Sequence, residues 1–412
     1  MRAELLSVGT ELLLGQITDT NAAYLARELA ALGIDVFFKQ TVGDNPERIQ
    51  ETLRLALSRA DVVLITGGLG PTEDDLTVDA VAKALGEELI EDPAVVGHVR
   101  QFFAARGRTP TANVFKQALV PRSARVIPNT RGTAPGIHLE RDGRMIFIMP
   151  GVPYEMETMM QEYVVPVLRA RAGGEIIGSR VLRVTGEGES AVEMRIKDLL
   201  ARTTPTIAPY AKLGEVHLRL TAKGTAETVA RQIAEGERLV RERLGDLIYG
   251  TDEESLEEVV GLLLSSRGQT LAVAESCTGG LLAQRLTSIP GSSGYFLEGV
   301  VAYSNSAKTE TLGVRAALLE AHGAVSAPAA EAMAQGVRAR AGSTYALSIT
   351  GVAGPGGGTA EKPVGLVYLG LATGDGAQHR RLTFGSQPGR TGIRHLAAQA
   401  ALNLLRLYLI GR

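Results

Sequence analysis

The stretch DVVLIT, residues 61–66, followed at once by GGLGPTEDDLT, residues 67–77, decides the fold of the first half of the chain. A short uninterrupted run of aliphatic residues predicts a strand that is covered on both faces. The glycines end this strand, and residues 75–85 have the apolar spacing of a helix. We therefore expect a buried strand, a glycine loop and a helix in succession.

The same alternation of strand and helix surrounds this stretch. Ala3–Val8 and Ile34–Val42 predict strands, and Asn21–Leu32 predicts an amphipathic helix between them. A second helix opens at Asn45-Pro46, and Arg144–Met149 predicts another buried strand. This order is typical of a mostly parallel sheet covered by helices, so we expect a three-layer α/β domain over residues 1–170.

Two further domains are expected beyond residue 170. Residues 171–174 are typical of a linker, and residues 171–250 predict a small α+β module. A polar hinge at residues 251–255 predicts the next boundary, after which apolar strands again alternate with helices. The sequence therefore predicts three domains, 1–170, 171–250 and 251–412, the last again of the α/β class.

The composition excludes several classes of protein. Lys and Arg number 43 and Asp and Glu 45, so the net charge of −2 leaves no excess of cations for sequence-independent binding of nucleic acid. Only 4% of residues are aromatic, and the single cysteine, Cys277, excludes an intrachain disulfide. No apolar run approaches the roughly 18 residues of a membrane span. We expect a cytoplasmic protein that acts on small molecules, without nucleic-acid or membrane partners.

The glycine loop predicts the first candidate site. Gly67, Gly68 and Gly70 allow backbone N–H groups to turn toward an anion, and the helix behind them adds the positive end of its dipole. The segment Pro150-Gly151-Val152-Pro153 is expected to close the same edge of the sheet, which places Gly151 beside the anion. An anion such as a phosphate or diphosphate fits this loop.

Four carboxylates accompany the loop. Acids beside a phosphate cradle are explained by a divalent metal ion, Mg²⁺ or similar, that lies between them. Helix capping is the alternative explanation for each acid taken alone. The candidate metal ligands are Asp44, Glu73, Asp74 and Asp75.

The order of these motifs resembles the molybdopterin-binding domain family, whose members have a MoaB/MogA-like fold. The matching segments are Gly9-Thr10-Glu11, Gly43-Asp44, residues 66–75 and residues 150–153. The molybdenum-cofactor proteins usually carry Thr at the position of Leu69 and commonly Arg at that of Glu73. The longer arrangement resembles the competence/damage-inducible CinA family, which implies a metal-dependent hydrolysis of ADP-ribose to AMP and ribose 5-phosphate. A transferase of pterin-cofactor biosynthesis, or a ligand-binding module without hydrolase activity, is the alternative for residues 1–170.

Four phrases between residues 274 and 394 predict a second site. Ser276 lies at a predicted strand-to-helix turn, where its hydroxyl could stand over amides that hold a phosphate or an oxyanion. None of the six histidines lies in these phrases, so a Ser-His-Asp triad is not expected. A desolvated lysine can replace histidine as the base, which favours a Ser–Lys pair, with Cys277 as the competing nucleophile. The phrases are AESCTGG (274–280), VAYSNSAK (301–308), SITGVAGPGGG (348–358) and GSQPGRTGIR (385–394).

These four phrases resemble the nicotinamide mononucleotide deamidase domain of the CinA family. The resemblance covers residues 255–410 and implies hydrolysis of nicotinamide mononucleotide to nicotinate mononucleotide and ammonia, with no cofactor. It implies Ser276 as nucleophile, Lys308 as base assisted by Tyr303, Thr350 at the substrate or oxyanion, and Arg390 at developing charge or phosphate. The remaining substrate-binding candidates are Thr278, Gly279, Gly280, Gly351, Gly354 and Arg394.

The middle module, residues 171–250, resembles the KH-like module of the same family. Its charge is nearly balanced and its glycines do not form the G-x-x-G clamp that binds nucleotides in KH domains. We therefore expect a spacer or a dimerisation element, and a homodimer. A non-enzymatic adaptor for DNA uptake is the third hypothesis for the whole chain, and the neutral charge and few aromatic residues count against it.

Overall fold

A six-stranded sheet carries the strands predicted in the first 170 residues. Its order is β2-β1-β3-β8-β7-β6, and the first four of these strands are mutually parallel, as predicted, whereas β7 and β6 are antiparallel. All five residues of β3 are buried, which accounts for its uninterrupted aliphatic run. The strands are β1 (Arg2–Val8), β2 (Asp35–Val42), β3 (Val62–Thr66), β6 (Arg125–Ile127), β7 (Gly136–Arg141) and β8 (Arg144–Met149).

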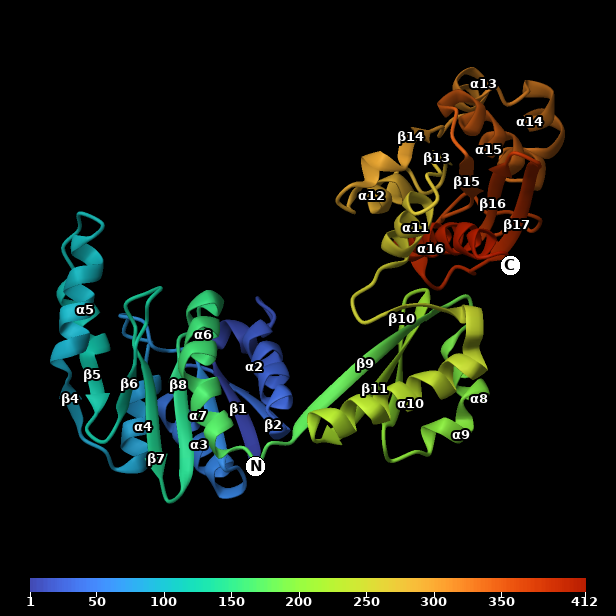
Figure 1. Ribbon diagram of the computed structural model, residues 1–412. Helices are drawn as coiled ribbons and strands as arrows, with labels where there is room; N and C mark the ends of the chain where they lie inside the picture. The colour runs from blue at the N-terminus through green and yellow to red at the C-terminus, as the bar shows by residue number, and fades with distance from the viewer. The chain divides into compact units, whose positions relative to one another are not determined.

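Helices cover both faces of this sheet and complete the three predicted layers (Figure 1). On one face Leu25 and Leu29 share a core with Met156 and Met160. On the other face Ile49 belongs to a second core. The helices are α1 (Thr10–Leu13), α2 (Thr20–Ala31), α3 (Pro46–Arg59), α4 (Thr77–Leu85), α6 (Pro153–Met159), the π-helix η2 (Met160–Val164) and α7 (Val165–Arg171).

An insertion between α4 and β6 was not predicted from the sequence pattern. Residues 89–121, here called the insertion, form a short antiparallel ribbon, a helix and a 3-10 segment around a small core of their own. Val95, Val99, Val114 and Ala118 make up that core. The elements are β4 (Leu89–Glu91), α5 (Pro93–Ala104), η1 (Ala112–Ala118) and β5 (Leu119–Pro121).

The middle of the chain forms the predicted small α+β module. A four-stranded sheet has the order β10-β11-β9-β12, and its pairs β10–β11 and β12–β9 are antiparallel. One apolar core includes Leu182, Leu218 and Val240. The elements are β9 (Ile176–Thr185), α8 (Glu189–Arg195), α9 (Lys197–Leu200), β10 (Thr206–Lys212), β11 (Glu215–Gly224), α10 (Ala226–Leu244), η3 (Gly245–Leu247) and β12 (Ile248–Thr251).

The last part of the chain contains a five-stranded sheet of order β14-β13-β15-β16-β17. β13 is parallel to both of its neighbours, and the remaining pairs are antiparallel. Separate apolar cores lie on its two faces. The strands are β13 (Leu271–Glu275), β14 (Phe296–Val301), β15 (Tyr345–Gly351), β16 (Leu366–Thr373) and β17 (Gly376–Thr383). The helices are α11 (Leu256–Ser265), α12 (Leu281–Thr287), η4 (Ser292–Gly294), α13 (Asn305–Leu312), α14 (Ala316–His322), α15 (Ala327–Ala341) and α16 (Gly389–Leu409).

This computed structural model describes residues 1–412. Contacts divide the chain into two units, residues 1–178 with 222–232 and residues 179–221 with 233–412. None of the helices combines the length and the apolar character that crossing a membrane requires.

Candidate active sites

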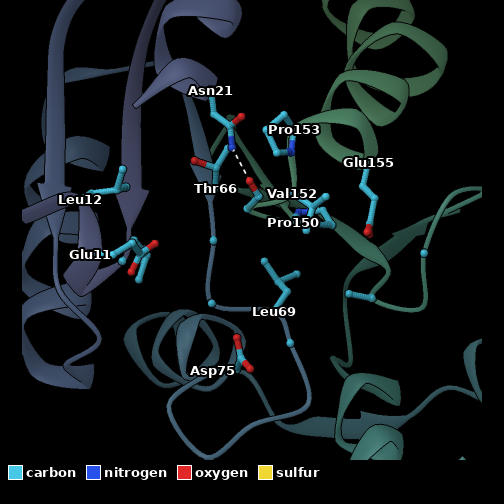
Figure 2. A pocket seen from close by; sticks show the side chains of 18 of the residues that line it. Glu11, Leu12, Asn21, Thr66, Leu69, Asp75, Pro150, Val152, Pro153 and Glu155 are labelled. Atoms are coloured by element: carbon cyan, nitrogen blue, oxygen red, sulfur yellow. Dashed lines mark hydrogen bonds between the residues drawn. The ribbon is translucent and has the colours of Figure 1, made fainter. Parts of the chain in front are cut away.

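The glycine loop after β3 borders a cavity of about 610 Å³ in the first unit. Figure 2 shows Leu69 of this loop between Asn21 on one side and Asp75 on the other. The Asn21 side-chain amide donates to the Gly151 carbonyl oxygen at 2.8 Å, which fixes the opposite rim. The structure therefore brings the predicted Gly67–Gly70 loop and Gly151 to one cavity.

The backbone of the loop offers free hydrogen-bond donors. The N–H of Gly67 is already engaged, because it donates to the Met149 carbonyl oxygen at 3.1 Å. The N–H groups of Gly68, Leu69 and Gly70 have no acceptor in the protein. A Cβ at Gly67 would collide with the Val8 carbonyl oxygen, so this glycine is required for close packing of two strand ends. The donors available to an anion are thus those of residues 68–70.

The predicted carboxylates are only partly brought together. Asp44, Asp74 and Asp75 line the cavity, whereas Glu73 is exposed and does not line it, because the loop turns its side chain to solvent. No three His, Cys, Asp or Glu side chains converge closely enough to hold a metal ion by themselves. Glu73 therefore drops out of the candidate ligands, and the four predicted carboxylates do not form a ready-made cluster. A metal site with substrate phosphates at this cavity stays a prediction.

Two of the acids nevertheless keep an oxygen free. Asp44 Oδ2 accepts the Thr10 N–H at 2.9 Å and the Thr10 hydroxyl at 2.8 Å, and Asp75 Oδ2 accepts the N–H and hydroxyl of Thr72. The Oδ1 atoms of Asp44 and Asp75 have no partner. Mg²⁺ is typically held by one or two carboxylates together with substrate phosphates, so these residues fit such an ion.

The sequence analysis missed four polar residues that shape this cavity. Lys116 Nζ donates to the Asp75 carbonyl oxygen at 2.7 Å, and Gln117 donates to the Leu69 carbonyl oxygen at 3.0 Å. Glu155 is buried and accepts a hydrogen bond from Asn129 at 2.6 Å. Lys116 and Gln117 come from the insertion and Asn129 from a distant loop, so no local spacing marked them.

The second candidate site forms at one edge of the five-stranded sheet. Ser276 directly follows β13, and Lys308 lies in the first turn of α13. Lys308 Nζ is 3.1 Å from Ser276 Oγ. It is also 2.9 Å from the carbonyl oxygen of Ala302 and 3.2 Å from that of Tyr303. The structure thus brings the two predicted residues into hydrogen-bond contact.

Lys308 lies in surroundings that disfavour its charged form. Its side chain is 1% exposed, and no carboxylate forms an ion pair with it. Burial lowers the pKa of Lys308 from its ordinary value of 10.5. In the neutral amine, two N–H groups can donate to the two carbonyl oxygens, which leaves the lone pair directed at the hydroxyl of Ser276.

The surroundings of Cys277 do not favour its action as a nucleophile. It is 6% exposed and belongs to an apolar core with Leu282 and Ile393. Burial raises the pKa of the Cys277 thiol to about 11, so the reactive thiolate is scarce near neutral pH. Of the two alternatives, the structure favours Ser276.

A carboxylate fills the N-terminus of α12, where the sequence had indicated an anion site. The helix begins at Leu281 rather than at Thr278. The Glu275 carboxylate, 0% exposed, accepts the N–H groups of Gly280 at 3.0 Å, Leu282 at 3.1 Å and Ala283 at 2.8 Å. These three N–H groups are therefore not available to a phosphate or oxyanion, which contradicts the anion-binding role expected for the amide of Gly280. Anion binding by the turn that follows Ser276 stays a prediction.

Two arginines at the start of α16 hold the surrounding loops. Arg390 donates to the Tyr303 hydroxyl at 2.9 Å and to the Gly354 carbonyl oxygen at 2.8 Å. Arg394 donates twice to the Thr278 carbonyl oxygen, at 3.1 and 2.6 Å. Because Tyr303 accepts from Arg390, its own O–H remains free to donate.

Three of the other predicted residues have local structural roles, and a fourth, Thr278, keeps an unpaired hydroxyl. The Thr350 hydroxyl is buried and donates to the Ala324 carbonyl oxygen at 2.8 Å, so it is not a free donor to an oxyanion. Gly351 lies in β15, where a Cβ would come within 2.7 Å of the Leu366 carbonyl oxygen. Thr278 is buried and its hydroxyl has no partner, while Gly279 forms the turn at a φ of 58°.

Comparisons with known proteins match all three parts of the chain. The family described as "Probable molybdopterin binding domain" matches residues 4–170, "Damage-inducible protein CinA KH domain" matches residues 179–250, and "CinA C-terminal domain" matches residues 253–409.

Full-length relatives carry related names. A "Putative competence-damage inducible protein" of Moorella thermoacetica is 53% identical over 407 residues, which are 98% of each chain. A "CinA-like protein" of Trichormus variabilis is 51% identical over 416 residues, covering 100% of both chains. A solved structure of competence/damage inducible protein CihA from Agrobacterium tumefaciens is 42% identical over 38% of this chain and 93% of its own, with a TM-score of 0.37. The chain belongs to the competence/damage-inducible CinA family, with a molybdopterin-binding-like domain, a KH-like module and a CinA C-terminal domain in succession.

Proposed function

We propose that residues 251–412 hydrolyse the carboxamide of nicotinamide mononucleotide to give nicotinate mononucleotide and ammonia. The observation that carries this proposal is the 3.1 Å contact between Ser276 Oγ and the buried amine of Lys308. Amide hydrolysis requires an activated nucleophile and a proton for the leaving nitrogen, and a serine with a desolvated lysine supplies both.

The acylation step follows from this geometry. Ser276 Oγ attacks the carboxamide carbon while its proton passes to the lone pair of Lys308 Nζ, giving a tetrahedral intermediate. The C–N bond then breaks, and the proton on Lys308 leaves with the amide nitrogen as ammonia. An ester between Ser276 and the nicotinate acyl group remains.

Deacylation repeats the same proton transfer with water as the nucleophile. Water loses a proton to Lys308, adds to the ester carbon and displaces Ser276 Oγ, which regains the proton. The net reaction consumes one water for each ammonia released. The Tyr303 hydroxyl accepts from Arg390, so its own O–H is available to donate to a bound substrate.

Ammonia release from nicotinamide mononucleotide by the purified full chain tests this function. We expect turnover by the wild type and loss of about 1000-fold or more in Ser276→Ala, the scale on which removal of a nucleophile acts in serine hydrolases. Absence of ammonia release by the wild type would refute the proposal.

We infer a second activity for residues 1–170, the metal-dependent hydrolysis of ADP-ribose to AMP and ribose 5-phosphate. The supporting observation is that the free N–H groups of residues 68–70 and the free Oδ1 atoms of Asp44 and Asp75 border the same cavity. The N–H groups would bind diphosphate oxygens, and the two carboxylates would hold the cation. The divalent ion would neutralise phosphate charge and lower the pKa of an attacking water.

Product analysis with ADP-ribose tests this activity. We expect AMP and ribose 5-phosphate from the wild type in the presence of Mg²⁺, and neither after a chelator is added. Asp75→Asn should lose this activity and keep ammonia release from nicotinamide mononucleotide. Equal ADP-ribose hydrolysis by the variant would refute the assignment of Asp75.

A further inference from the structure

One wall of the cavity in the first unit carries an aromatic ring. Phe102, from α5 of the insertion, lines the cavity and is half-buried. Most of the other lining residues are glycines, prolines, small polar residues and acids, and the only other aromatic one, Tyr154, is 58% exposed at the rim. Phe102 is thus the one half-buried aromatic ring among the lining residues, and its flat face suits a ligand with a flat apolar part.

The wall that holds Phe102 is fixed to a neighbouring loop. One turn before Phe102, His98 Nε2 lies 2.9 Å from the Gly132 carbonyl oxygen. The side-chain oxygen of Asn129 accepts the N–H groups of Arg131 at 3.0 Å and Gly132 at 2.8 Å. The Asn129 amide group donates in turn to the Ala134 carbonyl oxygen and to Glu155. The ring therefore stands on a rigid support rather than on a mobile loop.

Only one face of the ring is open to a ligand. The Arg106 guanidinium lies over the ring, 3.5 Å from its centroid, as a cation–π pair. This contact covers one face and holds the ring orientation. The His98 and Phe103 rings approach Phe102 at 6.1 and 6.3 Å in tilted and edge-on arrangements, so no aromatic ring of the protein is stacked on the other face. Base–aromatic stacking uses such a face, because every nucleobase presents a flat π-surface.

A cation accompanies the ring. Arg131 is the only Lys or Arg among the residues that line the cavity, and it forms no ion pair in the protein. The acids of the cavity are Glu11, Asp19, Asp44, Asp74, Asp75 and Glu155. A guanidinium in this setting is suited to a phosphate, which it can bind through two N–H donors.

We propose that the nucleobase of the substrate stacks on Phe102 and that Arg131 binds the phosphate attached to that nucleoside. The insertion also holds the glycine loop, because Lys116 and Gln117 donate hydrogen bonds to it. It therefore connects the part of the cavity at Phe102, which would bind the nucleoside, to the part at residues 68–70, which would bind the diphosphate. The site thereby selects nucleotides over sugar phosphates that lack a base. This inference rests on the proposed ADP-ribose activity for its reaction, but it makes a separate claim about binding.

Isothermal titration calorimetry of the full chain with AMP and with ribose 5-phosphate measures the binding of each half of ADP-ribose separately. Phe102→Leu keeps an apolar side chain but removes the ring, and we expect it to weaken AMP binding about 5- to 150-fold, the effect of losing one base–aromatic stack. Ribose 5-phosphate should bind with unchanged affinity. Phe102→Trp should restore AMP binding, and KM for ADP-ribose should rise in Phe102→Leu with kcat maintained.

Phe103→Leu is the matched control. Phe103 lies on the same helix and packs against the small core of the insertion; it meets the edge of the Phe102 ring at 6.3 Å but does not line the cavity. It should leave AMP affinity unchanged, which separates loss of stacking from damage to α5. Arg131→Ala should weaken binding of AMP more than that of adenosine.

Three results would overturn the inference. One is wild-type protein that does not bind AMP; another is Phe102→Leu protein whose affinities for AMP and ribose 5-phosphate fall equally. The third is a Phe103→Leu variant that behaves like Phe102→Leu. If the wild type binds AMP through Phe102 but does not cleave ADP-ribose, the proposed activity fails while the binding inference stands.

Discussion

Replacement of Glu275 by glutamine tests whether a buried carboxylate holds the turn that carries Ser276. Glu275 accepts three backbone N–H groups at the start of α12, and two of them share Oε2. Glutamine keeps one acceptor oxygen for that pair and directs an NH₂ group at the third N–H. In Glu275→Gln one charge-assisted hydrogen bond to a backbone N–H is therefore lost, and that buried N–H is left without an acceptor. The turn loses roughly 2–4 kcal/mol of local stability.

Hydrogen exchange measured by mass spectrometry reads this local stability directly. At 1.4 kcal/mol for each factor of ten, amides in peptides covering residues 276–287 should exchange about 30- to 700-fold faster in Glu275→Gln than in the wild type. The kcat for ammonia release should fall while KM holds, because the substrate contacts remain and Ser276 is displaced.

Glu258→Gln is the matched control for this experiment. Glu258 also accepts a backbone N–H at a helix start, but its capping box at α11 is only partly buried. It should leave exchange in residues 276–287 unchanged. Wild-type exchange rates in Glu275→Gln would refute the reasoning, since they would mean that the carboxylate does not hold the turn.

Three further predictions follow from named contacts. In the wild type, kcat/KM for ammonia release should rise with pH because the neutral amine is the active form, and Lys308→Met should abolish the activity. Since burial lowers the pKa of Lys308 in the folded protein, wild-type stability should fall as pH decreases from the ordinary value of 10.5 toward the lowered pKa and should level off below it; calorimetry should find this dependence weakened in the variant. Cys277→Ala should keep most of the ammonia release, and loss of activity in this variant would instead favour Cys277 as the nucleophile. In the folded wild type, alkylating reagents at neutral pH should leave the Cys277 thiol intact, as judged by mass spectrometry. Gly132→Ala should lower the melting temperature and raise KM for ADP-ribose, because the new Cβ would collide with the Glu155 carboxylate. In the matched change Gly107→Ala the new Cβ meets no neighbouring atom, although the φ of 63° at this position carries a strain cost of its own. Equal KM values in the two variants would contradict the role of the 129–134 loop.

The contact between Ser276 and Lys308 was predictable because of sheet topology. Both residues follow strands of one sheet, and β13 and β14 are adjacent and parallel. The carboxyl ends of parallel neighbours lie at the same edge, so residues that follow them meet there. The absence of histidine from the motifs then left lysine as the base.

The role of Glu275 could not be predicted in the same way. A glutamate at the end of an aliphatic strand gives no local sign that it will turn back to cap a helix that starts six residues later. The glycines at 279 and 280 suggested an anion site, and the protein fills that position with its own carboxylate. The local spacing correctly indicated that an anion lies at this helix start, but it did not indicate that the anion is the Glu275 carboxylate of the protein itself.

In the cavity of the first unit, too, some contacts were predictable from the sequence and others were not. The glycine loop and Asp75 are close in sequence, and their proximity was predicted. Asn129 and Glu155 are joined only by tertiary packing, and Phe102 belongs to an insertion whose elements carried no strong periodic signal. Glu73 was predicted as a ligand from its neighbours, but the turn that Thr72 and Asp75 form leaves it at the surface.

Rapid-quench mass spectrometry of the wild type mixed with nicotinamide mononucleotide tests the Ser–Lys chemistry most directly. We predict a covalent nicotinate mononucleotide acyl group on the peptide that contains Ser276, attached at that serine and absent from Ser276→Ala. Ammonia release at the wild-type rate by Ser276→Ala, or attachment of the acyl group to Cys277, would contradict the proposed mechanism.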